Sequence, residues 1–287
     1  MKADKNRMRN DVSYLTGISP YRNCQNLTSL KVISTYIQNE FNSMGLVSDE
    51  QVWTASRNQY KNIIASYNPQ KEKRLIIGAH YDVAGDQPGA DDNASGIAGL
   101  LEVARLVAAN KPEIDYRIDF VAYCLEEPPY FEKPEMGSYV HAKSLKENNV
   151  EVLGMICFEM IGYFSELDNS QPNPIPHLAV DFPKIGNFIL VLGIEAYSEF
   201  NEKTQELMLE NEEIDTLVLS LPANHELANL SDHINYWKFG YPALMITDTA
   251  KIRNPHYHES SDTIDTLKFE KMSEVVNSTY IAVVKLF

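Results

Sequence analysis

Three segments decide the fold: RLIIGA at residues 74–79, SGIAGLLEVARLVAA at 95–109 and RIDFVAYCL at 117–125. The first and third are short apolar runs, typical of strands that are buried on both faces of a sheet. The middle segment is apolar almost all round, which is typical of a buried helix. Strand, helix and strand in this order predict a largely parallel sheet covered by helices.

The pattern continues on both sides of these segments. Apolar runs predict further strands, and residues at helical spacing predict further helices. The predicted strands are 62–67, 152–158 and 242–247, and the predicted helices are 27–45, 195–213 and 267–287. Stretches rich in Pro, Asn and Asp at 128–136 and 165–177 predict surface loops. No repeat or long linker divides the chain, so we expect a single domain over residues 1–287.

The composition excludes some classes of partner. The chain has 40 acidic and 25 basic residues and a formal net charge of −15. Nucleic acids and anionic membranes both require a concentrated positive surface, so neither is an expected partner. No apolar run has the length that spans a bilayer. Metals, small substrates and peptides remain as the expected partners, and the sequence leaves the oligomeric state open.

The cysteines and the first residues bear on the compartment. Cys24, Cys124 and Cys157 are odd in number and far apart, so they indicate no disulfide framework. The opening MKADKNRMRNDVSYLTG has basic residues without the apolar core of a signal peptide. We therefore expect a cytoplasmic protein, and a periplasmic or secreted one if a signal peptide has been removed.

Groups of potential metal ligands fall where the predicted elements end. His80 directly follows a buried strand, and in open α/β sheets the carboxyl ends of the strands line the ligand crevice. Asp82 can accept the other ring N–H of His80 and fix its tautomer. Taken alone, His80 is interpreted equally well as a metal ligand or as a structural histidine held by hydrogen bonds. Asp91 and Asp92 precede the buried helix, where acidic residues also commonly act as caps.

The remaining candidates lie near the ends of two other strands and in the C-terminal loop. Glu126 and Glu127 follow an apolar strand; neighbours at a strand end point to opposite sides, so one can bind a metal while the other faces a bound water. Glu159 ends another strand, and His258 lies in the loop before the last helix. Histidines together with carboxylates suit zinc, and a bridging carboxylate suits a pair of metals. Spacing alone does not distinguish a metal site from ordinary polar turns.

The ordered segments resemble one known family. IIGAHYD, PGADDNASGIAGLLEVAR, DFVAYCLEE, MGS, CFEMIGY and YHESSDTIDTL are similar, in this order, to the co-catalytic di-zinc aminopeptidases. That family also contains glutaminyl cyclases and glutamate carboxypeptidases. The resemblance extends from about Asn62 to the C-terminus. It implies an α/β three-layer sandwich whose central mixed, mostly parallel sheet of about eight strands carries helices on both faces.

The resemblance also implies roles for individual residues. Two zinc ions would be bridged by Asp92, and the bond between Asp92 and Asn93 would be cis. The metal ligands implied are His80, Asp92, Glu127, Glu159 and His258. Glu127 and His258 would hold one ion, and His80 and Glu159 the other. The catalytic residues implied are Glu126 as general base, Asp82 as partner of His80, and Tyr257 as a donor to the tetrahedral intermediate.

The resemblance therefore predicts a metal-dependent exopeptidase, specifically an aminopeptidase that acts on peptides with a free N-terminus. Three features depart from the family pattern: Glu159 stands where many members have Asp, Gly137-Ser138 lies farther from the Glu pair than usual, and no inserted protease-associated domain is recognisable. The alternatives are a glutaminyl-peptide cyclotransferase with a single zinc, and a non-catalytic metal-binding relative.

Overall fold

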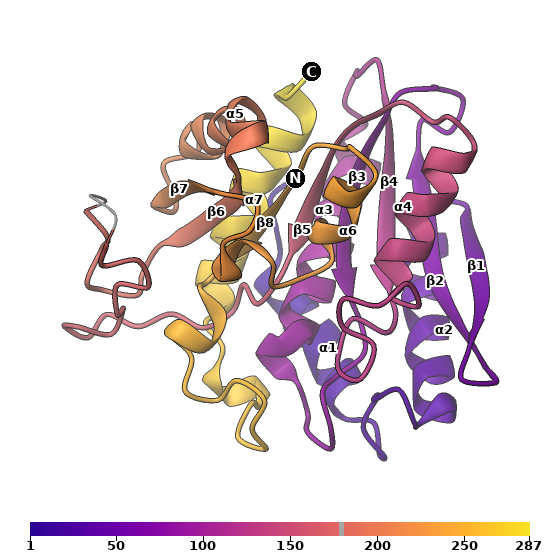
Figure 1. Cartoon of the computed structure of the whole chain (residues 1–287), viewed down its shortest axis with the longest axis horizontal. Helices are drawn as coiled ribbons and strands as arrows, with labels where there is room; N and C mark the ends of the chain where they lie inside the picture. Colours follow the sequence, from indigo (N-terminus) through magenta and orange to yellow (C-terminus); the bar gives the residue numbers. More distant parts are fainter. Residues whose placement is uncertain (178–180) are drawn as a thin grey trace.

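A central eight-stranded sheet organises residues 1–177 and 181–287, the part of the chain that the computed structural model describes (Figure 1). The strands lie side by side in the order β1-β2-β4-β3-β5-β8-β6-β7. Their bounds are β1 Ser48–Ala55, β2 Asn58–Tyr67, β3 Arg74–His80, β4 Arg117–Tyr123, β5 Val152–Phe158, β6 Ile189–Ile194, β7 Thr216–Leu221 and β8 Ala243–Thr247. The predicted number of about eight strands is confirmed.

The sheet is mixed, and its parallel part lies at the centre. β4, β3, β5 and β8 are neighbours that run parallel to one another, and β6 is parallel to β7. The pairs β1–β2, β2–β4 and β6–β8 are antiparallel. Loops that follow β4, β3 and β5 therefore leave the sheet at the same edge.

Helices cover both faces of this sheet, as expected (Figure 1). α2, α3, α5 and α7 pack on one face with α1 outside them, and α4 and α6 pack on the other. The helices are α1 Lys5–Thr16, α2 Leu27–Ser43, α3 Gly96–Asn110, α4 Gly137–Glu147, α5 Ser198–Leu209, α6 His233–Lys238 and α7 Phe269–Lys285. The short helical turns are η1 Ala90–Ser95, η2 Glu195–Tyr197, η3 Glu226–Ala228, η4 Ala250–Ile252 and η5 Ile264–Thr266.

Strand β3 shows why its sequence is apolar throughout. Leu75, Ile77 and Ala79 belong to the apolar core under α2, α3 and α7, whereas Ile76 belongs to the core under α4 and α6. Alternate side chains of a strand point to opposite faces, so a strand covered on both sides has no exposed position. The predicted three-layer α/β sandwich is confirmed.

Several predicted boundaries need correction. The strand predicted over 117–125 ends at Tyr123, and Leu125 has a φ of +66°, which is outside the range of extended strand residues. Glu126 and Glu127 therefore lie beyond the strand, and both line the same cavity instead of pointing to opposite sides. Three strands and three helices were not predicted from the sequence: β1, β6, β7, α1, α4 and α6. Among the described residues, no helix combines the length and apolar character needed to cross a membrane.

Candidate metal centre

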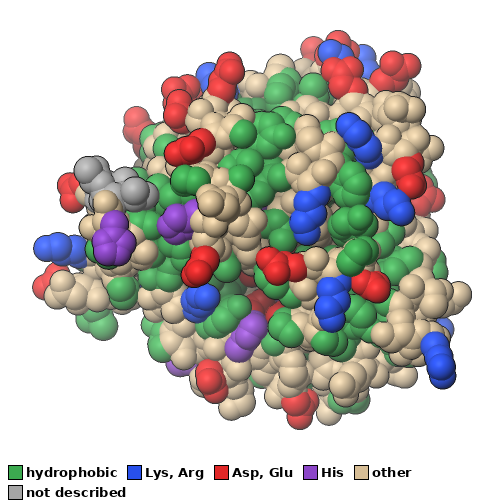
Figure 2. Space-filling view, in the orientation of Figure 1, with side chains coloured by type: hydrophobic (Ala, Val, Ile, Leu, Met, Phe, Trp, Pro, Cys, Tyr) green, Lys and Arg blue, Asp and Glu red, His purple; other side chains and the backbone are tan. Residues whose placement is uncertain are grey.

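The predicted ligands come together at the sheet edge where β3, β4 and β5 end. His80 is the last residue of β3, Glu127 follows β4 and Glu159 directly follows β5. Asp92 lies in η1, between β3 and α3, and His258 lies in the loop between η4 and η5. Figure 2 shows acidic side chains recessed into this side of the molecule.

The carboxylate of Asp92 lies between the two histidines. Its Oδ1 is 3.4 Å from Nε2 of His80, and its Oδ2 is 3.1 Å from Nε2 of His258. Two oxygens of one carboxylate thus face two different imidazoles. This arrangement can place one metal on each side of Asp92.

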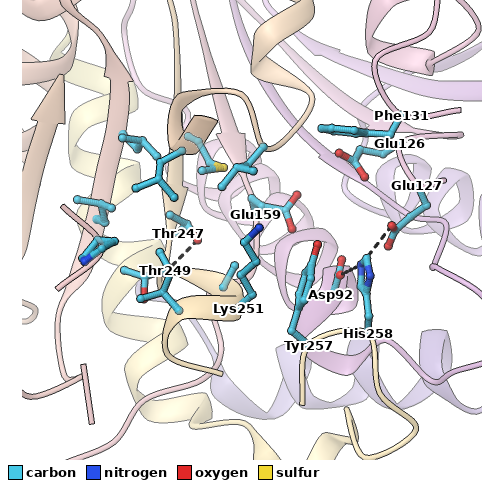
Figure 3. A pocket seen from close by; sticks show the side chains of 18 of the residues that line it. Asp92, Glu126, Glu127, Phe131, Glu159, Thr247, Thr249, Lys251, Tyr257 and His258 are labelled. Carbon is cyan, nitrogen blue, oxygen red and sulfur yellow. Dashed lines mark hydrogen bonds and ion pairs between the residues drawn. The ribbon is translucent and has the colours of Figure 1, made fainter. Parts of the chain in front are cut away.

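Each histidine has a second carboxylate beside it. Oε2 of Glu159 is 3.3 Å from Nε2 of His80. Oε2 of Glu127 is 3.4 Å from Nε2 of His258, the contact drawn in Figure 3. The potential ligand atoms of His80, Asp92 and Glu159 lie within 4.8 Å of one another, and so do those of Asp92, Glu127 and His258. These two groups are the ligand sets that the resemblance implies.

The residues fit a bound metal by their chemistry and by their unused polar atoms. The two ring nitrogens of His80 and Oε1 of Glu127 are buried. None of these three atoms has a hydrogen-bond partner among residues 1–177 and 181–287. Buried polar groups are rarely left without partners, and those that are call for an ion or a water. Imidazole nitrogens and carboxylate oxygens in groups of three suit zinc.

The electrostatic field of the centre favours positive charge. Burial, reinforced by the negative charge of Asp92, raises the pKa of Glu127 to about 7. Burial opposes the charged form of His258, but hydrogen bonds to Asp92 and Glu127 outweigh it and raise its pKa to about 10. An excess of buried carboxylates that holds a proton on an imidazole also stabilises a cation in the same place.

Glu126 lies beside the two groups. Its Oε2 is 3.8 Å from Nε2 of His80, and its side chain is buried while it lines the cavity. Burial raises the pKa of Glu126 well above its ordinary value. Ligand atoms of His80, Glu126 and Glu127 form a third possible group, so distance alone also allows Glu126 as a ligand.

Asp82 fixes the backbone that carries the glutamate pair. Its two oxygens accept the backbone N–H groups of Glu126 and Glu127, each at 3.2 Å. The predicted contact with Nδ1 of His80 has a distance of 3.6 Å, which is an ion-pair distance beyond the range of a hydrogen bond. Asp82 therefore holds the backbone that follows β4 in place, and it also faces His80.

Tyr257 stacks on His258, with ring centroids 3.8 Å apart and an angle of 16° between the planes. Its hydroxyl points into the cavity, toward Asp92 and Glu159 (Figure 3). Burial, with the negative charge of Asp92 next in importance, raises the pKa of Tyr257, so the hydroxyl keeps its proton at neutral pH.

Three further residues support the centre and were not singled out from the sequence. Asp262 accepts the backbone N–H groups of Asp91 and Asp92, at 2.9 and 3.1 Å, and so fixes η1. Ser231 hydrogen-bonds Glu159, and the buried Asp232 has two oxygens without a partner in the described part of the chain. Burial raises the pKa of Asp232 to about 7. Ser231 and Asp232 belong to SDH at 231–233, and Asp262 belongs to YHESSDTIDTL; both segments lie in the region of resemblance, which was the available signal.

The peptide bond between Asp92 and Asn93 is cis, as the resemblance implies. The side chain of Asn93 ties η1 to the residues after β5. Its Nδ2 donates to the carbonyl of Phe158 at 2.9 Å, and its Oδ1 accepts the N–H of Met160 at 3.1 Å. Asp92 and Glu159 are therefore connected through Asn93.

A cavity of about 220 Å³ opens beside the centre (Figure 3). Glu126, Glu127, Glu159 and Tyr257 line one side of it. The other side is mainly apolar and consists of Leu190, Leu192, Leu219, Leu227, Leu230 and Met245. Pro174 and Lys251 also contribute. The arrangement places an apolar pocket next to a candidate metal centre.

Comparison with known sequences gives a consistent result. Residues 62–280 match the sequence model of peptidase family M28. The chain is 40% identical over 283 residues to the uncharacterized protein YfbL of Escherichia coli, covering 96% of this chain and 86% of YfbL. It is 26% identical over 238 residues to leucine aminopeptidase 1 of Fusarium vanettenii. That match covers 77% of this chain but only 54% of the fungal protein.

Solved structures share the fold at low sequence identity. LapB from Legionella pneumophila has a TM-score of 0.78 at 22% identity, covering 98% of this chain and 72% of LapB. A glutaminyl cyclase from Bacteroides thetaiotaomicron bound to N-acetylhistamine has a TM-score of 0.74 at 18% identity, covering 99% of both chains. These similarities show the common α/β fold.

Proposed function

This chain belongs to peptidase family M28, and we propose that it is a di-zinc aminopeptidase. The family and the leucine aminopeptidases among the relatives of the chain support a metal-dependent exopeptidase. The chain would hydrolyse the first peptide bond of substrates with a free N-terminus. The observation that carries the proposal is the position of Asp92, whose two oxygens face His80 and His258 separately. This position supports two ions rather than one.

The five residues His80, Asp92, Glu127, Glu159 and His258 would hold the ions. Zinc bound there would lower the pKa of a coordinated water and polarise the substrate carbonyl. Asp82 would keep Glu126 and Glu127 in place through their backbone N–H groups. The protein thus contributes a fixed set of ligands, of which His80, Asp92, Glu127 and Glu159 are buried and His258 is exposed.

Glu126 is the proposed general base. Its carboxylate would accept a proton from the attacking water and then deliver that proton to the nitrogen of the leaving amine as the C–N bond breaks. Its raised pKa, which burial causes, suits a group that must take up and release a proton near neutral pH. Tyr257 would donate a hydrogen bond to the oxygen that becomes negative during the attack.

The apolar side of the cavity would take the side chain of the N-terminal residue. Leu190, Leu219 and Met245 come from three strands of the sheet, and Leu227 and Leu230 come from the segment before α6. The segments 165–177 and 224–233 contribute to this cavity through Pro174 and these two leucines, and they would recognise the free terminus of the substrate. A large apolar N-terminal residue fits such walls.

Zinc content and product analysis of the purified full chain test the proposal. We expect two zinc ions per chain, loss of activity with a chelator, recovery with zinc, and release of the first residue from aminoacyl-anilides and peptides. A peptide with N-terminal Gln separates the alternatives. One zinc and formation of pyroglutamate would indicate a cyclotransferase, and bound metal without turnover of any substrate would indicate a non-catalytic relative.

A further inference from the structure

Arg22 is fully buried, and within the described part of the chain its guanidinium hydrogen-bonds only to backbone carbonyl groups. It lies in the segment between α1 and α2, before the residues that match the family. Nε donates to the carbonyl of Tyr81 at 2.8 Å, and Nη2 donates to that of Gly89 at 2.7 Å. Nη1 donates to the carbonyls of Leu15, at 3.2 Å, and Pro88.

The carbonyls of Tyr81, Pro88 and Gly89 belong to the two loops that carry candidate metal ligands. Tyr81 stands between His80 and Asp82, and Gly89 is the residue before η1, which contains Asp92. Arg22 therefore connects the end of β3 to the start of η1. Since Leu15 is in α1, the same guanidinium also anchors both loops to the N-terminal helix.

The loop before η1 packs closely around this guanidinium. Gly89 has a φ of +61°, and a Cβ there would lie 3.1 Å from Nη2 of Arg22 and 2.2 Å from the carbonyl oxygen of Asp92. The carbonyl group of Arg22 also accepts the N–H of Val83, at 3.3 Å. The backbone of Arg22 and its side chain thus both contact the loops that carry the ligands.

The charge of Arg22 does not explain its position. In the described part of the chain no carboxylate lies within ion-pair distance of it, whereas the partly buried Arg105 pairs with Asp11, Glu40 and Glu102. Burial lowers the pKa of Arg22 to about 10, so it stays protonated at neutral pH. A fixed positive charge near the centre opposes the binding of further cations. Any gain in metal affinity from Arg22 must therefore come from the geometry that it imposes.

We propose that Arg22 is a positioning residue of the metal centre, which holds His80 and Asp92 in register through the carbonyls of Tyr81, Pro88 and Gly89. The proposal rests on the proposed zinc centre. It makes the segment before residue 62 part of the functional unit. Removing a residue that orients metal ligands without itself contacting the metal typically lowers metal affinity by about 10–100-fold.

The test compares zinc affinity with stability in full-length variants. Arg22→Met removes the donors, and Arg22→Lys keeps the charge but cannot reach both loops with a planar fork. Arg105→Met and Arg105→Lys serve as controls, because Arg105 is a partly buried arginine whose ion pairs in the described residues are with Asp11, Glu40 and Glu102, none of them a candidate ligand. Zinc affinity is measured by competition with a chromophoric chelator, and thermal unfolding is measured on the metal-free proteins.

We expect Arg22→Met to bind zinc about tenfold more weakly or worse, and Arg22→Lys to show a smaller loss in the same direction. The Arg105 variants should unfold at lower temperature but bind zinc like the parent chain. Unchanged or stronger zinc binding by Arg22→Met overturns the proposal, as does an equal loss in the Arg105 variants. If Arg22→Met does not fold, parent affinity in Arg22→Lys overturns it and weaker binding supports it. A parent chain that binds no zinc would instead contradict the proposed function itself.

Discussion

Ser231 donates a hydrogen bond from its Oγ to Oε2 of Glu159 over 2.6 Å, and both side chains are buried. The same oxygen of Glu159 lies 3.3 Å from Nε2 of His80. Glutamate is one methylene longer than the aspartate expected at this position. The bond from Ser231 fixes the longer side chain toward the imidazole, so the departure from the family pattern has a local compensation.

Removing this hydroxyl should weaken one of the two proposed zinc sites. We expect Ser231→Ala to lower the affinity for one of the two ions by about tenfold, because the carboxylate loses the bond that orients it. Zinc titration of the metal-free protein measures this. Ser278→Ala removes another buried hydroxyl, which lies in α7 and accepts a hydrogen bond from Nδ2 of Asn211, and should leave both affinities unchanged. Equal effects of the two substitutions would show that the bond has no specific role.

The two adjacent glutamates should separate catalysis from metal binding. Glu126→Gln keeps the shape but removes the base, so turnover should fall by at least about a hundredfold with zinc content unchanged. Glu127→Gln should lose zinc, because an amide is a poor ligand beside a carboxylate. Activity and bound zinc are measured on both variants. A fully active Glu126→Gln, or one that alone loses metal, would reverse the proposed roles.

The apolar side of the cavity should determine the preferred N-terminal residue. Leu227 is half-buried and lines the cavity, so Leu227→Asp places a charge against an apolar substrate side chain. We expect kcat/KM for Leu-anilide to fall by about tenfold or more relative to Ala-anilide. The exposed Leu209 at the end of α5 does not line the cavity, and Leu209→Asp serves as the control. An unchanged ratio of the two substrates would place the first residue elsewhere.

His141 should make the fold sensitive to acid. It is buried against Tyr236, with Asp119, Arg74 and Arg117 nearby, and burial lowers its pKa from 6.5 to about 4. A base with a lowered pKa in the folded state contributes stability above pH 6.5 that is lost as the pH falls toward 4. We therefore expect the unfolding free energy of the parent to fall relative to His141→Gln by up to about 3 kcal/mol over this range. Denaturant unfolding at several pH values measures it, and parallel curves would contradict the shift.

The sequence by itself determined the central part of the fold and the chemistry of the candidate ligands. β3 and β5 are apolar throughout because both faces of the sheet are covered, and α3 is apolar almost all round because it packs between the sheet and the helices α1, α2 and α7. The order of the motifs also assigned the candidate ligands, which the structure brings together at one sheet edge.

Peripheral elements were not predicted, because their sequences do not reveal which face will be covered. β1 is mostly exposed or half-exposed, and α1 buries only a narrow set of side chains. β6 is a short apolar run, and periodicity cannot assign such a run to a strand or a buried helix. These elements acquire their structure from the neighbours against which they pack.

Only the tertiary structure decided which groups support the centre. Arg22 binds the carbonyls of Tyr81 and Gly89, and Ser231 binds Glu159, across long stretches of chain. An arginine in a loop or a serine before a helix has many possible partners, and the sequence contains no distance between them. Hydrogen bonds act over about 3 Å, so the packing of the sheet and helices must first bring the groups together. Residue types therefore determined the chemistry available to this protein, and the fold determined which of those residues act together.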